Sequence, residues 1–515
     1  MVVEAAFVSV LAAAFAGLAL SAVIERLMTP RPLLARPWAA WALHAGLWLS
    51  AHAPLALALG RPWFAAAAVS AFLLLLVLVN NAKFKSLREP FVFQDYEYFT
   101  DAIRHPRLYI PFLGWGKFLG AVAGFVLAVA VGWWGEAAPA QRFAGSGQLG
   151  GVALVLATGG LLLLAGTRHA LPVSFQPAQD VRALGLLASL WRYAEAEQVP
   201  LTVASPFDAL PQGRPAGDLP HLLAVQSESF FDPRSLYPGI RQDVLAGFDR
   251  LRADAVAHGK LRVPAWGANT VRTEFAFLTG LGEDALGVHR FNPHRAVAAG
   301  CAVPSLASYL KRLGYLTVCI HPYPASFYRR DRVYPRLGFD TFVDIRAFDE
   351  TMRAGPYIGD AAVADKVDAL LRQATGPVFV FVITMENHGP LHLERAVPSD
   401  IDTLYAVPPP AGCDDLTIYL RHLRNADRMV ARLRQTLAGC GRPASLCWYG
   451  DHVPIMPAVY EAFGAPDGAV EYVLTGVETG DDPGRQPAGS AEAQQLHAHD
   501  LALRWLRVVG LVPSC

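Results

Sequence analysis

The stretch Leu222-Leu223-Ala224-Val225-Gln226-Ser227-Glu228-Ser229 (residues 222–229) decides the fold, because a short apolar run ends here in a carboxylate between two hydroxyls. Short apolar runs bounded by polar residues are typical of strands buried on both faces of a parallel sheet. In open α/β sheets the ligand site lies at the carboxyl ends of the strands. The stretch therefore predicts an α/β domain with Glu228 at its functional edge.

Three more apolar runs repeat this pattern, and each is followed by acidic or imidazole side chains. They are residues 317–320, followed by His321; residues 378–383, followed by Glu386, Asn387 and His388; and residues 446–448, followed by Asp451 and His452. We expect a mainly parallel sheet that delivers these side chains to one edge; the alternative is that the strands are only core and the pattern is coincidence. Carboxylate oxygens together with imidazole nitrogen suit a divalent ion, Mn²⁺ or Zn²⁺.

A fifth element, residues 266–275, has the sequence Trp-Gly-Ala-Asn-Thr-Val-Arg-Thr-Glu-Phe and lies between the first two runs. A loop that contains glycine leads here into a helix predicted to continue through Leu278, and Thr270 stands at the helix start. Backbone amides and the helix dipole favour an anion at such a position. Two interpretations stay open: Thr270 is an N-cap completed by Thr273 or Glu274, or it is a nucleophile activated by a metal.

The first 170 residues differ in composition from the rest of the chain. The whole chain is 53% hydrophobic and only 17% charged, with 44 basic and 44 acidic residues. Residues 1–170 contain 12 basic and 7 acidic side chains, whereas residues 171–515 contain 32 and 37. The hydrophobic content excludes a disordered chain, and the balanced charge gives no signature of nucleic-acid binding.

Five apolar stretches in this first part are suited to crossing the roughly 30 Å hydrocarbon layer of a membrane. They are residues 5–24, 39–59, 63–79, 118–134 and 152–166. No Asp, Glu, Lys or Arg lies within them, so we predict an α-helical five-span anchor over residues 1–170 rather than a transporter. His44 and His52 are expected to pack helices rather than to relay protons.

Two further segments separate these parts. Residues 80–117 combine Lys83, Lys85 and Arg88 with several aromatic side chains, which suits either an interfacial element at the lipid head groups or a solvated loop. Residues 171–219 contain several prolines and are predicted to be a linker that begins with a helix over residues 180–197.

Five short motifs occur in one order along residues 220–515. They are Gln226-Ser227-Glu228-Ser229-Phe230, Asn269-Thr270 with Thr273-Glu274-Phe275, Ser326-Phe327-Tyr328-Arg329-Arg330-Asp331, Asn387-His388-Gly389-Pro390 and Tyr449-Gly450-Asp451-His452. The ordered set, together with the anchor, resembles the lipoteichoic acid synthase and phosphoglycerol transferase branch of the alkaline phosphatase and sulfatase superfamily. The resemblance implies a sulfatase-like catalytic domain over residues 220–515.

The resemblance also implies roles for individual residues. The implied ligands of one divalent metal, usually manganese with zinc or magnesium as alternatives, are Glu228, Thr270, Asp451 and His452. Thr270 would be the nucleophile that takes phosphoglycerol from a phospholipid and passes it to a glycan or polymer outside the cytoplasm. The implied contacts to the head group and phosphate are His321, Tyr328, Arg330 and His388. Tyr328 stands where the branch often has tryptophan, and its ring can still stack on a glycerol.

Other functions stay open at this point. A sulfatase or phosphodiesterase could use the same fold, but formylglycine sulfatases need Cys or Ser in a Cys/Ser-x-Pro-x-Arg context, and Thr270 is followed by Val271 and Arg272 without a proline. A non-catalytic envelope scaffold would not need the complete ligand set from Glu228 to His452. A phosphoethanolamine donor is an alternative to phosphoglycerol.

The expected location is the cytoplasmic (inner) membrane of a bacterium, with several spans. For five spans, the count of basic residues places the C-terminal domain in the cytoplasm, whereas the resemblance implies that it lies outside, and we favour the second argument. All six cysteines lie within residues 301–515. A disulfide between Cys413 and Cys440 is a hypothesis that suits an oxidising compartment.

Overall fold

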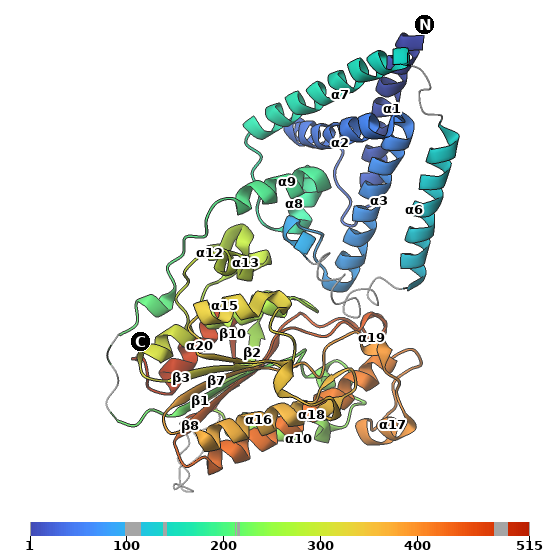
Figure 1. The fold of residues 1–515 in the computed structure, drawn as a ribbon. Helices are drawn as coiled ribbons and strands as arrows, with labels where there is room; N and C mark the ends of the chain where they lie inside the picture. Colours follow the sequence, from blue (N-terminus) through green and yellow to red (C-terminus); the bar gives the residue numbers. More distant parts are fainter. Residues whose placement is uncertain are drawn as a thin grey trace. The chain divides into compact units, whose positions relative to one another are not determined.

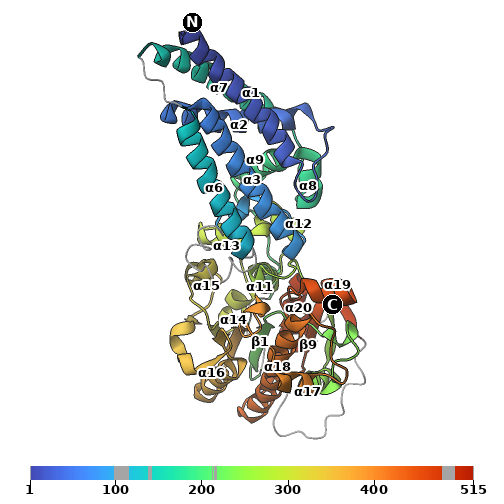
Figure 2. The same ribbon diagram turned by 90° about the vertical axis from the view of Figure 1, so that its right-hand side faces the viewer.

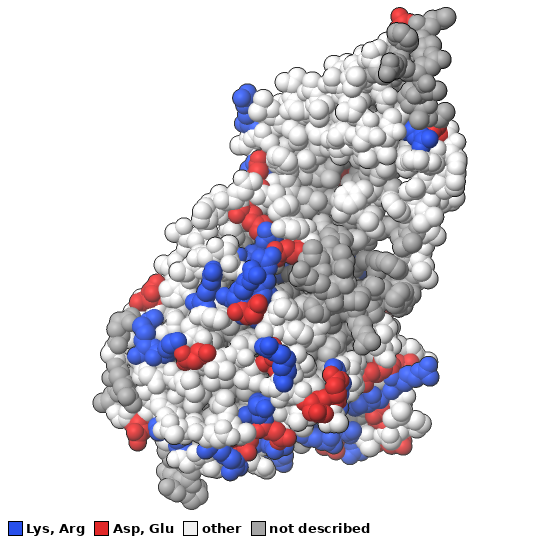
Figure 3. Space-filling model, in the orientation of Figure 1, with Lys and Arg blue, Asp and Glu red and all other residues white. Residues whose placement is uncertain are grey.

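The computed structural model describes residues 2–97, 115–136, 142–211, 213, 217–477 and 493–513 (Figures 1 and 2). The chain divides into two compact units, Met1–Val199 and Pro200–Cys515, and each has buried apolar clusters of its own. On the face drawn in Figure 3, the described residues of the first unit show few charged side chains, whereas basic and acidic side chains are interspersed over the second. The difference in charge content along the sequence is therefore also a difference between two folded units.

Helices make up the first unit. They are α1 (Val2–Glu25), α2 (Trp38–Leu59), α3 (Pro62–Leu87), α6 (Trp115–Gly135), α7 (Arg142–Arg168), α8 (Pro177–Leu184) and α9 (Leu186–Glu197), with a short 3-10 turn η1 (Phe93–Asp95). Four of them are long and apolar enough to cross a membrane: Val3–Glu25, Trp38–Leu59, Pro62–Leu87 and Ser146–Arg168. The unit is a membrane anchor by length and composition, which agrees with the predicted class.

Among the described residues four of the five predicted spans are found, so the part of the chain that the structure describes supports four spans rather than five. The stretch predicted as the fifth, residues 118–134, is helical within α6, but the part of α6 whose residues are fully described does not make up a span of 18 residues. The predicted interfacial segment, residues 80–117, falls partly outside the described residues. Its beginning completes α3, and the amine of Lys83 lies 2.7 Å from Glu89 and 2.6 Å from Asp95.

Close helix packing and buried polar contacts hold the anchor together. A Cβ added to Gly17 of α1 would lie 2.4 Å from the ring of Trp48 on α2, so a small residue is needed at this crossing. The ring of His44 bonds the hydroxyl of Ser21 at 2.8 Å, and the ring of His52 bonds the carbonyl of Pro62 at 3.1 Å. Both histidines therefore join one helix to the next.

The segment predicted to begin the linker folds within the first unit. Val181 of α8 and Leu186 of α9 are buried in one cluster with Ile24 of α1 and Leu73 of α3. The carboxylate of Glu25 accepts a hydrogen bond from the amide of Leu186 at 2.6 Å. These contacts fix the path of the chain between the last long helix and the second unit.

The second unit is built on an eight-stranded, mainly parallel sheet. Its strands are β1 (His221–Ser227), β2 (Ala257–Arg262), β3 (Leu316–Ile320), β4 (Thr341–Val343), β7 (Val378–Ile383), β8 (Ala444–Gly450), β9 (Val470–Leu474) and β10 (Gln494–His497). The strand order is β10-β2-β9-β8-β1-β7-β3-β4, and β9 runs antiparallel to both of its neighbours. The four predicted strands are β1, β3, β7 and β8, which lie side by side and parallel, so the predicted α/β sheet is confirmed.

Helices cover both faces of this sheet. The remaining elements are α10 (Ala246–Ala253), α11 (Thr270–Thr279), α12 (Glu283–Leu286), α13 (Pro293–Ala298), α14 (Leu306–Arg312), α15 (Arg330–Arg336), α16 (Asp360–Gln373), α17 (Pro398–Leu404), α18 (Asp414–Gly439), α19 (Pro457–Phe463) and α20 (Ala498–Val508), with a hairpin of β5 (Arg353–Ala354) and β6 (Tyr357–Ile358). Figure 1 shows α10, α16 and α18 on one side of the sheet and α15 and α20 on the other. A strand covered by helices on both faces has an apolar sequence, which explains why four strands could be predicted from the sequence.

The hypothesis of a Cys413–Cys440 disulfide is wrong. Both thiols are free, and they stand just before and just after α18, a helix of 26 residues. At about 1.5 Å of rise per residue, the two ends of such a helix lie roughly 39 Å apart, whereas a disulfide needs Cα atoms within about 7 Å.

Candidate functional site

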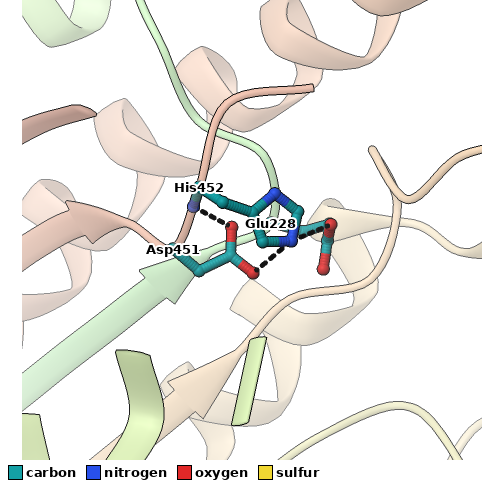
Figure 4. A group of neighbouring side chains, drawn as sticks. All are labelled: Glu228, Asp451 and His452. Carbon is teal, nitrogen blue, oxygen red and sulfur yellow. Dashed lines mark hydrogen bonds and ion pairs between the residues drawn. The ribbon is translucent and has the colours of Figure 1, made fainter. Parts of the chain in front are cut away.

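Two adjacent parallel strands place the three central side chains of the site. β1 and β8 are paired so that Ser227 lies opposite Gly450, the last residue of each strand. The next residues along the chain are Glu228 on one side and Asp451 with His452 on the other. One ligand atom from each lies within 4.8 Å of the others, and all three side chains are buried (Figure 4). The structure therefore brings together three of the four predicted metal ligands at the carboxyl edge of the sheet.

Hydrogen bonds orient the carboxylate of Asp451 so that one oxygen faces its partners. Oδ1 accepts hydrogen bonds from the amide of Ser229 at 2.7 Å and from the amide of His452 at 2.8 Å. Oδ2 is buried and has no hydrogen bond among the described residues. It lies 3.3 Å from Nε2 of His452, and that nitrogen is 3.7 Å from Oε1 of Glu228. A buried acceptor without a donor, beside a second carboxylate and an imidazole, is the arrangement expected of a cation site.

The electrostatics of Glu228 lead to the same conclusion. Burial, and then the charge of Asp451, raise the pKa of Glu228 from 4.5 to about 8. Two carboxylates buried side by side repel each other, and a divalent cation between them would offset that repulsion. The residues present thus fit a metal held by Glu228, Asp451 and His452. When bound, such an ion neutralises phosphate charge and lowers the pKa of a hydroxyl in contact with it.

Thr270, the predicted nucleophile, lies beside this cluster. It is the first residue of α11, it is 7% exposed, and its Oγ1 is 3.5 Å from Nε2 of His452. The interpretation of Thr270 as an N-cap is wrong, because Asn269 is the cap residue. Thr273 makes no cap either, since its hydroxyl donates to the carbonyl of Asp451 at 2.8 Å. That contact ties the start of α11 to the loop after β8 and holds Thr270 near His452.

Several residues at or next to the predicted site residues have a strained backbone conformation. In the described part of the second unit, the non-glycine residues with positive φ are Ser229 (52°), Asn269 (65°), Tyr328 (53°) and Arg329 (55°). Each is next to, or is itself, a predicted site residue. A left-handed backbone conformation costs such a residue of order 1 kcal/mol or more. It is kept only where contacts with the surrounding structure enforce it. Strain of this kind is typical of functional sites.

A buried arginine and a neutral histidine stand next to the cluster. The guanidinium of Arg330 donates to Glu274 at 2.6 and 3.2 Å, and its Nη1 is 3.2 Å from Nε2 of His321. Arginine only donates, so this nitrogen of His321 accepts, and Nδ1 carries the proton that is bonded to the carbonyl of Ile383 at 3.1 Å. Burial, and then the charge of Arg330, hold the pKa of His321 well below its usual value.

The last two predicted contacts surround this pair. The ring of Tyr328 lies 5.2 Å from the centre of the Arg330 guanidinium, a cation–π distance. His388 bonds its neighbouring carbonyl, that of Gly389, through Nδ1 at 2.6 Å, and burial lowers the pKa of its ring. Charges on both Asp451 and Arg330 act on His388. The imidazole therefore belongs to the same edge of the sheet, although its role as a substrate contact stays a prediction.

Sequence reasoning missed two residues of this edge. The hydroxyl of Thr384, directly after β7, accepts a hydrogen bond from the amide of Glu228 at 2.9 Å. The position after a buried strand was a usable signal for Thr384. Tyr357 lies with its hydroxyl 3.4 Å from Nδ1 of His388. It comes from a two-residue strand, which leaves no pattern in the sequence.

The chain is similar to several known proteins, in sequence or in structure. The capsular polysaccharide biosynthesis protein RkpI of Rhizobium meliloti is 29% identical over 444 residues, which cover 80% of this chain and 77% of RkpI. The structure of the lipooligosaccharide phosphoethanolamine transferase EptA from Neisseria meningitidis shares the fold over 94% of both chains, at 12% identity and a TM-score of 0.54. That of the phosphoglycerol transferase GacH from Streptococcus pyogenes matches 62% of this chain and 79% of its own, at 18% identity and a TM-score of 0.44.

A family model settles the membership that the five motifs indicated. The model described as Sulfatase matches residues 220–497, which is more than half of the chain. The match begins at β1 and ends with β10, so it covers the whole sheet and all the candidate site residues. The chain thus belongs to the sulfatase family.

Proposed function

We propose that this protein is a membrane-anchored, metal-dependent transferase that moves phosphoglycerol, or a related phospho-alcohol, from a phospholipid onto an extracytoplasmic glycan or polymer. One observation carries the proposal. A buried threonine hydroxyl, Oγ1 of Thr270, stands at a helix start within 3.5 Å of a buried cluster of two carboxylates and an imidazole. This is where a hydroxyl nucleophile can meet a phosphate bound by a metal.

The chain's own residues account for two successive displacements. In the first, Oγ1 of Thr270 bonds to phosphorus while the bond from phosphorus to the diacylglycerol oxygen breaks, and diacylglycerol leaves with a proton. In the second, an acceptor hydroxyl displaces Oγ1, which regains its proton. The amides at the start of α11 and the guanidinium of Arg330 would hold the phosphate oxygens, because phosphoryl transfer needs mainly positioning and neutralisation of charge.

The side chains around this centre suit a small polar head group. Tyr328, stacked against Arg330, offers a ring face to a glycerol, and Nε2 of His388, whose Nδ1 is bonded to the carbonyl of Gly389, can accept a hydrogen bond from the head group. A phosphoethanolamine group would fit the same contacts. The name of the relative RkpI, a capsular polysaccharide biosynthesis protein, supports a glycan as the acceptor.

The four spans found among the described residues support an extracytoplasmic catalytic unit. With these four spans, the segments after the first and third spans lie on one side and contain eight basic residues, three between positions 26 and 36 and five between 88 and 142. Basic loops stay in the cytoplasm, so the C-terminal unit would lie outside. Charge counting and the family resemblance then agree. A reporter domain fused after residue 515 tests this: alkaline phosphatase should be active there, and a fusion active only with a cytoplasmic reporter would contradict it.

The reaction is tested with full-length protein in liposomes of defined lipid composition and with Mn²⁺. Labelled phosphatidylglycerol should yield diacylglycerol, and a Thr270 peptide should carry the label when no acceptor is present. Thr270→Ala should abolish both signals, whereas Thr279→Ala, at the other end of the same helix, should keep them. Diacylglycerol release from phosphatidylethanolamine and not from phosphatidylglycerol would identify phosphatidylethanolamine as the donor. Diacylglycerol release that survives Thr270→Ala would refute the nucleophile.

A further inference from the structure

One imidazole joins both ends of the segment that carries His388. This segment, residues 386–394, follows β7 and contains the Asn387-His388-Gly389-Pro390 motif. Nδ1 of His422, on α18, is 2.9 Å from Oε1 of Glu386 at its beginning. Nε2 of the same ring is 2.8 Å from Oε1 of Glu394 at its end. His422 is 2% exposed, so its ring is buried, and the contact to Glu386 is buried while that to Glu394 is partly buried.

Both ring nitrogens of His422 must carry protons for this bridge to exist. Ionised carboxylates only accept hydrogen bonds, so each nitrogen has to donate, and the ring is an imidazolium. Burial acts to lower the pKa of His422, but its hydrogen bonds to Glu386 and Glu394 outweigh burial and raise that pKa to about 9. Charged hydrogen bonds are shorter and stronger than neutral ones, and here two of them converge on one ring.

Each end of the segment is also fixed to a neighbouring helix. Glu386 accepts hydrogen bonds from the side chain of Asn425 at 2.5 Å and from the first amide of α16, that of Asp360, at 2.7 Å. Glu394 accepts one from Arg421 at 3.2 Å. The carboxylates are therefore held by α16 and α18, and His422 connects the two anchor points. A short loop with both ends fixed has few conformations left to its middle.

The middle of the segment is where His388 faces the site. Its Nδ1 is turned to the carbonyl of Gly389, and the hydroxyl of Tyr357 lies 3.3 Å from the same carbonyl oxygen. Gly355, in the turn between β5 and β6, is packed so closely on Glu394 that an added Cβ would lie 2.9 Å from its carboxylate. The hairpin that carries Tyr357 thus rests on the same anchored segment.

We propose that His422 is a positioning residue of this enzyme: by bridging Glu386 and Glu394 it holds the His388 imidazole where the phospho-alcohol head group binds. The inference rests on the proposed function, because it takes His388 as a substrate contact. His422 does not itself touch substrate. Displacing a substrate-binding side chain by about 1 Å can cost up to about 10²-fold in rate, and removing a residue that orients a binding group typically costs 10- to 100-fold.

Two variants separate this role from a general structural one. His422→Gln keeps a polar side chain of similar length but cannot bridge two carboxylates, and His392→Gln changes an exposed histidine of the same segment. Hydrogen exchange of the full-length protein with Mn²⁺ should be faster in residues 386–394 for His422→Gln and unchanged for His392→Gln. Unchanged exchange in His422→Gln would refute the bridge, whether or not the protein acts on lipids.

A double-mutant cycle tests whether His422 acts through His388. The substrate is bis(p-nitrophenyl) phosphate, a chromogenic phosphodiester without a lipid. We expect His422→Gln to lower kcat/KM about tenfold in the wild-type background and less than about twofold when His388→Ala is already present. Equal losses in both backgrounds would overturn the proposal. If His422→Gln does not fold, Glu394→Gln, which removes the charge at one end, takes its place with the same two outcomes. If the wild-type protein cleaves this diester but releases no diacylglycerol from lipid, the proposed function is contradicted. The double-mutant cycle would still test the role of His422.

Discussion

The carboxyl group of Glu228 should make the stability of the metal-free protein depend on pH. Its pKa is 4.5 in the unfolded chain and about 8 in the fold, because it is buried next to Asp451. A group whose pKa is raised by folding contributes stability below the unfolded pKa, and that contribution is lost as the pH rises through the folded pKa. At about 1.4 kcal/mol per pKa unit, the loss between pH 4.5 and 8 amounts to about 5 kcal/mol.

The assay is thermal unfolding of the catalytic unit in full-length protein, followed from pH 5 to pH 8.5 with EDTA and with Mn²⁺. For a unit of roughly 300 residues the entropy of unfolding is about 0.6 kcal/mol/K, so the part of the loss that falls between pH 5 and pH 8, about 4 kcal/mol, lowers Tm by about 7 °C. Mn²⁺ should remove most of this decline, because a bound cation favours both carboxylates in their charged form. Glu228→Gln with EDTA is the matched control. Its Tm should fall less than that of wild type over the same pH range, and the difference should equal the decline attributed to Glu228. An equal decline in Glu228→Gln and wild type would refute the argument.

Three further outcomes follow from single contacts. Thr270→Ala should lower diacylglycerol release at least about 10³-fold, because the nucleophile is lost, while Mn²⁺ still raises Tm; a loss of that Mn²⁺ effect would instead show Thr270 to be essential for binding the metal. Arg330→Met should destabilise the fold by about 3–5 kcal/mol in chemical denaturation, because Glu274 is left buried with its charge uncompensated, and the double variant with Glu274→Leu should recover most of that loss. Unreduced protein should react at both Cys413 and Cys440 with a maleimide after unfolding, and a pair that reacts only after reduction would contradict the separation of these thiols by α18.

The sheet could be predicted where a buried strand has an uninterrupted apolar sequence. β1, β3, β7 and β8 are apolar because both of their faces are covered, and these four were predicted. β9 is equally buried, but its sequence is interrupted by Glu471, whose carboxylate pairs with Lys260 on β2. β2 and the edge strand β10 are partly exposed and polar. Their pattern does not differ from that of a loop.

The candidate site divides in the same way. Glu228, Asp451 and His452 could be predicted because each directly follows a buried strand, and parallel strands end at one edge. The number of spans, the disulfide and the N-cap role of Thr270 could not be judged correctly from spacing. Cys413 and Cys440 are separated by one long helix, and Thr270 has its place because Thr273 binds the backbone of Asp451, a contact between segments far apart in the chain.

By itself, the amino-acid sequence determined that the chain combines an apolar anchor with an α/β domain and that carboxylates and imidazoles end its central strands. Burial of a strand requires apolar residues at consecutive positions, so it is visible in the composition and spacing of that stretch of sequence. Only the tertiary structure decided which partners these side chains meet: Thr270 beside His452, Arg330 with Glu274 and His321, and His422 bridging the segment of His388. Such contacts join residues that are distant in sequence. They depend on how helices pack on the sheet, and no local pattern records them.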